Sequence, residues 1–226
     1  MIDRPRNRPG NQSRPIALEH VRRPMLRSNP QHRCTRGNKM LVRGLISFIL
    51  SVLLAASWVP TVASEPTTIE DFTKQPQARW RFVTDGVMGG VSSGQVVFMQ
   101  NGDRPYARMT GRVSTANRGG FIQMRLDLLS SAPKGSTGVR LIVRGNDQRY
   151  FVHLRTTGTI LPWQYYQAGF QVTRGWTEVR LPFDAFVASG ALLRTEIQPH
   201  SLTSVAVVAY GRDHEAEIDV REVGFY

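Results

Sequence analysis

The sequence has almost no cysteine, because Cys34 is the only one among 226 residues. Residues 65–226 contain none, so this part of the chain forms neither a disulfide nor a thiolate metal site. A domain of about 160 residues can be stabilised by its own hydrophobic core instead. We therefore expect one domain without covalent cross-links over residues 65–226.

Acidic residues are also scarce, with 17 Asp and Glu against 29 Lys and Arg and a formal net charge of +12. The excess is concentrated in residues 1–39, where ten basic residues accompany only Asp3 and Glu19. Without residues 1–64 the net charge falls to about +3. A strongly basic chain generally suggests a nucleic-acid partner, but we expect none for residues 65–226.

Long hydrophobic runs are missing as well, since a membrane-spanning helix needs about 20 apolar residues. The one apolar run, at residues 45–59, follows the basic Arg43 and precedes small side chains at residues 62–64. This pattern is typical of a secretory signal peptide. We predict a signal peptide at residues 40–64, cleaved after Ser64, and therefore an exported domain that is periplasmic or secreted.

Residues 1–39 precede this signal peptide and show almost no hydrophobic periodicity. One interpretation is a mis-assigned start, with translation beginning at Met40. The other is a disordered basic extension. Both interpretations exclude this segment from the folded domain.

The remaining chain lacks any sustained helical stripe, apart from one turn expected at residues 184–188. Apolar residues instead alternate with polar ones in short runs separated by Gly, Asn, Asp and Pro, a rhythm typical of antiparallel strands. The sequence therefore predicts an all-β fold, an antiparallel jelly-roll β-sandwich, and not a closed barrel. The clearest strands are predicted at residues 106–113, 120–128, 137–144, 149–156, 176–183, 202–210 and 216–225.

Several arginines fall on the side of their strands opposite the predicted core, because neighbouring side chains point to opposite faces. If these strands are neighbours, the arginines form one basic, partly aromatic surface for an anionic glycan, a lipid head group or an acidic protein segment. Otherwise they form an ordinary solvated face. The candidate binding residues are Arg125, Arg140, Arg144 and Arg155, with Trp163 and Tyr165 as aromatic residues expected to be exposed.

Residues 90–94 match G-x-S-x-G, the nucleophile motif of α/β-hydrolases, in which a helix follows the serine. Here a strand is predicted at residues 95–99, so we expect a glycine turn without catalytic residues, in which Ser92→Ala has little effect. An acidic side chain can cap such a turn, and glycines permit positive φ or close backbone approach. The residues of this turn are Asp85, Gly86, Met88, Gly89 and Gly90.

Metal chemistry is not indicated, because His153, His200 and His214 have no ligand-like spacing. Alternating carboxylates at residues 213–219 are candidates for calcium, but they fit a solvated strand face better. We therefore predict no metal site and no cofactor, while a structural calcium stays open.

Three separated segments resemble one known family: WRFVTDGVMGGVSSG at 80–94, NRGGFIQMR at 117–125 and WTEVRLPFDAF at 176–186. Their order and spacing resemble those of the complex I intermediate-associated protein 30 family, and the resemblance spans residues 69–226. It implies a galactose-binding-like jelly roll and, for mitochondrial members, a non-catalytic assembly factor of respiratory complex I. It supplies no catalytic residues.

The function expected from the sequence is therefore that of a binding module and not of an enzyme. The first hypothesis is an assembly-factor-like module that binds a membrane-associated protein at the outer face of the inner membrane. The alternative hypothesis is a carbohydrate-binding module of the jelly-roll type in the periplasm.

Overall fold

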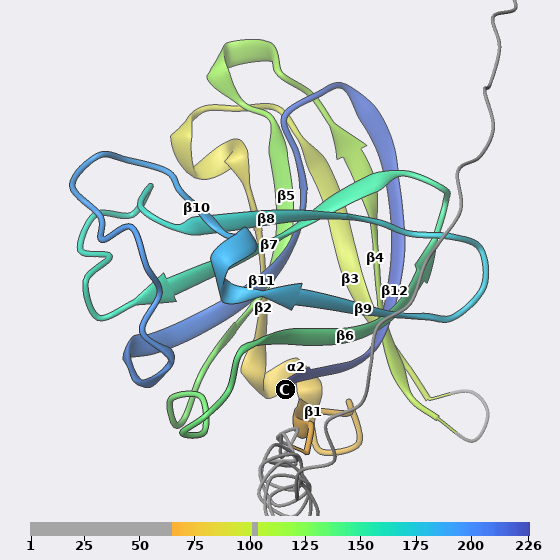
Figure 1. Ribbon diagram of the computed structural model, residues 1–226. Helices are drawn as coiled ribbons and strands as arrows, with labels where there is room; N and C mark the ends of the chain where they lie inside the picture. The colour runs from red at the N-terminus through yellow and green to blue at the C-terminus, as the bar shows by residue number, and fades with distance from the viewer. Residues whose placement is uncertain (1–64, 101–103) are drawn as a thin grey trace, which may run out of the picture. The chain divides into compact units, whose positions relative to one another are not determined.

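The computed structural model describes residues 65–100 and 104–226 (Figure 1). The predicted signal peptide at residues 40–64 and the basic extension at residues 1–39 lie outside the described residues. In the described part of the chain, no helix is long and apolar enough to cross a membrane.

Two antiparallel sheets of six strands make up the fold (Figure 1). Sheet A has the order β3-β4-β12-β6-β9, with β1 paired to β12, and sheet B has the order β10-β8-β7-β11-β5-β2. The strands of sheet A are β1 (Thr67–Glu70), β3 (Ser93–Met99), β4 (Tyr106–Val113), β6 (Gly138–Gly145), β9 (Thr177–Pro182) and β12 (His214–Phe225). The strands of sheet B are β2 (Trp80–Thr84), β5 (Phe121–Asp127), β7 (Arg149–Thr156), β8 (Tyr166–Gln171), β10 (Val187–Ala188) and β11 (Leu202–Tyr210).

The chain crosses repeatedly from one sheet to the other, which gives the predicted jelly-roll sandwich. β4, β7 and β11 have the predicted bounds, and the other predicted strands are offset by one or two residues. The helical turn expected at residues 184–188 is wrong in its second half. A 3-10 turn, η3 (Phe183–Ala185), is followed by β10, which pairs with β8.

The core lies between the sheets and is built from alternate residues of the strands. Met124 and Leu154 of sheet B are fully buried, as are Met109 and Leu141 of sheet A. Full burial of one such side chain contributes about 1.5–3 kcal/mol. The predicted division of these strands into a core face and an outer face is confirmed.

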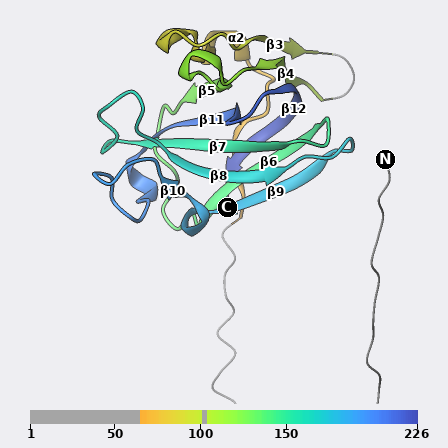
Figure 2. The same ribbon diagram turned by 90° about the horizontal axis from the view of Figure 1, so that it is seen from above.

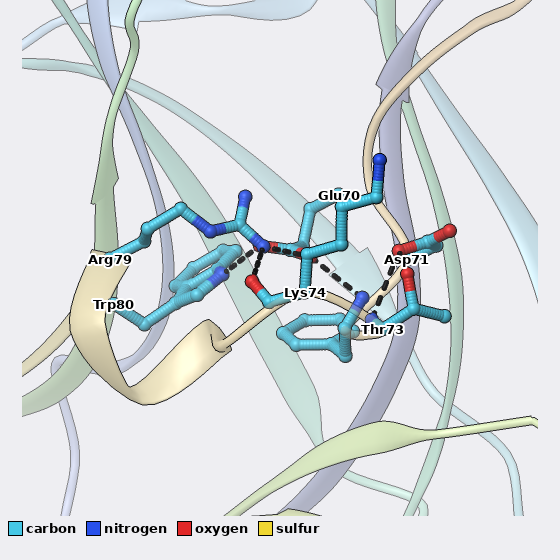
Figure 3. Close-up of polar contacts among 7 residues, drawn as sticks. Glu70, Asp71, Thr73, Lys74, Arg79 and Trp80 are labelled. Atoms are coloured by element: carbon cyan, nitrogen blue, oxygen red, sulfur yellow. Dashed lines mark hydrogen bonds and ion pairs between the residues drawn. The ribbon is translucent and has the colours of Figure 1, made fainter.

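The carboxylate of Glu70 fastens the segment between β1 and β2, which includes α2 (Pro76–Arg79) (Figure 3). This buried side chain accepts hydrogen bonds from the Trp80 indole (2.8 Å), the Phe72 N–H (2.6 Å) and the Arg79 guanidinium (2.9 Å). The rings of Phe72 and Trp80 stack with centroids 5.5 Å apart. The buried carboxylate of Glu70 is thus paired with Arg79. The rings of Phe72 and Trp80 beside it are part of the core.

The carboxylate of Asp85 joins the two sheets. Asp85 begins the 3-10 turn η1 (Asp85–Met88) and is fully buried. It accepts hydrogen bonds from the backbone N–H groups of Ser92 (2.9 Å), next to β3, and of Gly120 (2.5 Å) and Phe121 (3.2 Å), at the start of β5. The Ser92 hydroxyl donates another. One side chain therefore holds η1, a strand of sheet A and a strand of sheet B together.

Ser92 is part of this arrangement, and its surroundings do not match the nucleophile motif of α/β-hydrolases. Its buried hydroxyl donates to Asp85 and accepts from the Ser114 N–H at 2.9 Å. β3 follows it where a nucleophile motif requires a helix. The expectation that Ser92→Ala has little effect is corrected, because the substitution removes one donor from Asp85 and leaves a backbone N–H without its acceptor.

The glycines of this turn serve different purposes. Gly89 has φ of 86°, which is in the left-handed region that favours glycine. A Cβ on Gly90 would overlap the carboxylate of Asp85, whereas a Cβ on Gly86 would meet only the Thr84 hydroxyl at 3.1 Å. Gly90 is therefore required for close approach to Asp85, and Gly86 is not.

We predict that Gly90→Ala lowers the free energy of unfolding by about 1–3 kcal/mol, because the new methyl group displaces the Asp85 carboxylate. The matched substitution Gly86→Ala is expected to cost less than about 1 kcal/mol. Urea denaturation of both variants makes the comparison. Equal losses would contradict the role given to Gly90.

The contribution of Asp85 to the free energy of unfolding is expected to depend on pH. Burial raises the pKa of its carboxyl, but the hydrogen bonds from Ser92, Gly120 and Phe121 outweigh burial and hold the pKa below its ordinary value. Its stabilising contribution is therefore complete above an ordinary carboxyl pKa of about 4. The contribution is lost as the pH falls through the lower folded-state pKa.

We predict that Asp85→Asn lowers the free energy of unfolding at pH 7 by at least about 3 kcal/mol, since several hydrogen bonds to a charged group are weakened. Asp71→Asn is the control, because Asp71 is exposed and, among the described residues, accepts hydrogen bonds only from Thr73. Asp71→Asn is expected to lower the free energy of unfolding by less than about 1 kcal/mol. A neutral effect of Asp85→Asn in urea denaturation would refute the central position of this carboxylate.

Candidate functional site

The outer face of sheet B, the face turned away from the core, combines basic, aromatic and amide side chains. Strand register aligns Arg81, Arg125, Ala206, His153 and Gln167 in one row across β2, β5, β11, β7 and β8. The alternation of side chains directs the whole row outward. One continuous surface therefore carries residues from five strands.

Small residues on β11 form the floor of this face. Ser204, Ala206 and Val208 occupy its outward positions and yet are only 4%, 2% and 0% exposed. Their register partners on the flanking strands are larger residues: Asp127, Arg125 and Gln123 on β5, and Arg155, His153 and Phe151 on β7. The character of the surface is therefore set by the flanking strands.

Aromatic rings cluster on the β7–β8 side of the face. His153 stacks on Tyr165, with centroids 4.0 Å apart and rings 8° from parallel, and packs edge-on against Tyr210 at 5.7 Å. Phe151 packs edge-on against Tyr210 at 5.9 Å. His153 Nε2 lies 2.9 Å from Gln167 Oε1. The cluster is a preorganised aromatic and polar surface.

The cluster is uncharged at neutral pH. Burial lowers the pKa of His153 to about 4, although the hydrogen bond to Gln167 opposes this shift. Burial, with the neighbouring Tyr210, raises the pKa of Tyr165 above its ordinary value. The imidazole and the phenol therefore act as neutral hydrogen-bonding and stacking groups.

A pocket of about 220 Å³ lies at one end of the same face, and we call it the arginine pocket. It is small, since sites for drug-sized ligands occupy about 300–1,000 Å³. Charged and hydroxyl side chains make up most of its lining. The lining residues are Arg125, Asp127, Arg155, Thr159, Thr203 and Ser204.

The predicted single arginine surface is wrong, because the four arginines belong to two sheets. Arg125 and Arg155 are on sheet B and meet at the arginine pocket. Arg140 and Arg144 are on β6 of sheet A and point away from the core on the other side of the sandwich. Alternation gave the correct direction relative to the core but contained no information on which strands share a sheet.

Arg140 and Arg144 are neutralised by acidic partners. Arg140 lies 2.8 Å from Glu178 and also pairs with Glu222. Arg144 shares the buried carboxylate of Asp219 with Arg108, at 2.8 Å and 2.7 Å. These side chains form a structural ion-pair network and not an open anion site.

Trp163 and Tyr165 differ in exposure. Trp163 is 63% exposed in the β7–β8 connection, as expected. Tyr165 is half-buried against His153, so the expectation that it is exposed is only partly correct. The family-motif turn at Asp85–Met88 has a structural role. Met88, its last residue, is 58% exposed.

Sequence reasoning missed Gln167, Tyr210, Thr159 and Ser204 as parts of this face. Tyr210 was visible only as the end of a predicted strand, and the order of strands in sheet B was needed to bring it beside Phe151 and His153. Thr159 joins the pocket through its loop: the Arg155 guanidinium donates to the Thr159 carbonyl at 2.8 Å. No local signal in the sequence identifies such a contact.

The carboxylates considered for calcium do not converge. Asp213 accepts from the Thr115 backbone at 2.7 Å, and Asp219 is held by Arg108 and Arg144. Within residues 65–100 and 104–226, no group of three or more His, Cys, Asp or Glu is arranged to hold a metal ion.

The lowered pKa of His153 predicts a pH effect on stability. The unfolded chain takes up a proton near pH 6.5, whereas the folded chain does so only near pH 4. The free energy of unfolding therefore falls as the pH falls from 6.5 to 4, by up to about 1.4 kcal/mol per pH unit. Urea denaturation is expected to show a loss of about 2 kcal/mol between pH 6.5 and 5.

The variant His153→Gln is expected to lose most of this pH dependence. Some will remain, because burial also lowers the pKa of His214. His200→Gln, at an exposed histidine, is the control and is expected to behave like the wild type. An unchanged pH profile in His153→Gln would show that His153 is not buried in its neutral form.

Carbohydrate-binding modules are among the solved structures with a similar fold, while no curated protein matches the sequence. The family 11 module of the cellulosomal cellulase Lic26A-Cel5E of Clostridium thermocellum superimposes with a TM-score of 0.59 at 9% identity, over 72% of this chain and 95% of the module. A family 11 module from the same organism, in complex with a β-1,3-1,4-mixed-linked tetrasaccharide, gives 0.58 at 9% identity, over 72% and 96%. At this identity the likeness concerns the fold.

The sequence itself identifies the family. The sequence model of the complex I intermediate-associated protein 30 family matches residues 70–219, which is more than half of the chain. This range includes the Asp85 turn and all strands of sheet B. The chain therefore belongs to the complex I intermediate-associated protein 30 family.

Proposed function

We propose that this domain is a non-catalytic binding module that holds a glycan against the outer face of sheet B. Sugar rings stack on aromatic side chains, and their hydroxyl groups bond to amide and charged groups. The observation that carries the proposal is the assembly of His153, Tyr165, Tyr210 and Gln167 beside the arginine pocket. The family 11 module with a bound tetrasaccharide supports it by analogy of fold.

A protein partner is the second candidate function, in line with the assembly role that the family name implies. One observation favours it. Large apolar side chains are exposed on the two neighbouring connections β7–β8 and β10–β11, which Figures 1 and 2 both show at the same end of sheet B. Such residues are typical of protein interfaces. They are Ile160 (83%), Leu161 (38%), Trp163 (63%) and Leu192 (88%).

The proposed module acts outside the cytoplasmic membrane, because the sequence predicts a signal peptide at residues 40–64. Its non-catalytic character is supported by the position of Ser92, the serine of the G-x-S-x-G match. The hydroxyl of Ser92 is buried and already bonded to Asp85 and Ser114.

A glycan array probed with the protein and with Tyr165→Ala tests the proposal. Removal of the ring that stacks on His153 is expected to weaken glycan binding at least about tenfold, as for a typical aromatic hot spot. Tyr106→Ala is the matched control, because Tyr106 is a half-buried tyrosine on the outer face of sheet A. It is expected to bind like the wild type.

The outcomes separate the two candidate functions. If no glycan binds, but a membrane protein is captured by the wild type and not by Tyr165→Ala, the face binds protein and the glycan proposal is wrong. If Tyr165→Ala binds every ligand as the wild type does, the outer face of sheet B is not the binding surface.

A further inference from the structure

The arginine pocket has more positive than negative charge. Its lining contains two guanidinium groups, Arg125 on β5 and Arg155 on β7, and one carboxylate, Asp127, which also pairs with Arg81 of β2. Arg81 makes the close ion pair with Asp127. No second carboxylate lies within ion-pair distance of the other two arginines among the described residues.

Arg125 is less well compensated than Arg81, which makes the close ion pair with Asp127. Its Nε is buried and has no hydrogen-bond partner in the described part of the chain, and it lies 3.7 Å from the nearer Asp127 oxygen. Burial lowers the pKa of Arg125, and the charges of Arg81 and Arg155 lower it further. A cation that is partly buried among like charges favours an incoming anion.

Arg155 is held in place without being neutralised. Its guanidinium donates to the Thr159 carbonyl at 2.8 Å and to the Leu161 carbonyl at 3.1 Å. These bonds fix its orientation, and carbonyl oxygens carry no net charge. The same loop carries the exposed indole of Trp163, two residues after Leu161.

The rest of the lining suits a sugar. Thr203 is exposed and Ser204 adjoins it, so hydroxyl groups lie beside the guanidinium groups. A volume of about 220 Å³ suits a single ring and not an extended ligand. Guanidinium groups recognise planar carboxylates through paired N–H donors, while hydroxyl groups and an exposed indole match the remaining chemistry of a pyranose.

We propose that the arginine pocket binds the carboxylate of a uronic acid unit in an acidic polysaccharide. The inference rests on the proposed glycan-binding function and adds the chemical class of the ligand. Arg125 and Arg155 bind the carboxylate, and Asp127 competes with it for Arg125. The aromatic cluster around His153 contacts the neighbouring sugar units.

Calorimetric titration of the protein with matched oligosaccharides tests the proposal. The panel contains galacturonate, mannuronate–guluronate and glucuronate-containing oligomers, each beside its methyl-esterified counterpart. At least one acid is expected to bind about 10- to 100-fold more tightly than its ester, as hydrogen bonds to a charged group predict. Its affinity is expected to fall with increasing salt concentration.

Two substitutions are expected to act in opposite directions. Arg125→Gln weakens binding of the acid about 10- to 100-fold and leaves binding of the ester within about twofold. It is expected not to lower the free energy of unfolding, because the buried Nε of Arg125 has no hydrogen-bond partner among the described residues. Asp127→Asn tightens binding of the acid severalfold, because it removes the competing carboxylate. Arg112→Gln on sheet A, 78% exposed, is the control without effect.

Each contrary result has a separate meaning. If acids and esters bind equally and Arg125→Gln has no effect, the pocket inference is overturned while the glycan-binding function stands. If no glycan of the panel or of the array binds, both proposals fail. Binding of hexaglutamate peptide or of phosphatidylglycerol vesicles in that case, with loss in Arg125→Gln, assigns the pocket to an acidic protein or to a membrane.

Discussion

The fully buried carboxylate of Asp85 joins the two sheets, and the position of the candidate site depends on it. It accepts hydrogen bonds from Ser92, next to β3, and from Gly120 and Phe121, at the start of β5. The start of β5 fixes its register, and four residues further along the strand Arg125 reaches the arginine pocket. The turn that contains the family motif therefore has a structural role, because Asp85 holds the start of β5, the strand that carries Arg125.

The two outer faces of the sandwich differ in how their charges are compensated. On sheet A, Arg140 contacts two glutamates, and Arg108 and Arg144 share Asp219. On sheet B, Arg125 has only a distant carboxylate and a buried donor without a partner among the described residues. A folded domain generally pairs its partly buried charges. Arg221 on β12 of sheet A also has a buried Nε without a partner among the described residues, but its guanidinium lies over the Trp176 ring at 4.6 Å. Arg125 differs because it lines a pocket, and this position supports the proposal of a ligand on sheet B.

Much of the fold could be predicted from the sequence, because apolar and polar residues alternate along a strand that has one buried face. Alternation alone placed Arg125 and Arg140 on the side of their strands opposite the core, and their sequence neighbours Met124 and Leu141 are fully buried. The pairing of strands is a long-range property that a single sequence does not encode locally. The assignment of Arg125 and Arg140 to one surface was wrong for this reason.

Only part of the candidate site could be predicted from the sequence. Arg155, Trp163 and Tyr165 were identified from residue type and position. Tyr210 and Gln167 became visible only when β7 was placed between β11 and β8. The order of the two functional hypotheses also changes: the resemblance favoured a protein partner, whereas the aromatic and arginine-rich face of sheet B favours a glycan.

We propose that the outer face of sheet B is the binding surface. Backbone amide chemical shifts, followed by NMR as the protein is titrated with the tightest glycan of the array, test it directly. We expect shift changes along β5, β7, β8 and β11 and in the β7–β8 connection, with β4, β6 and β12 largely unaffected. Shift changes concentrated on β4, β6 and β12 would place the ligand on sheet A and refute binding on sheet B.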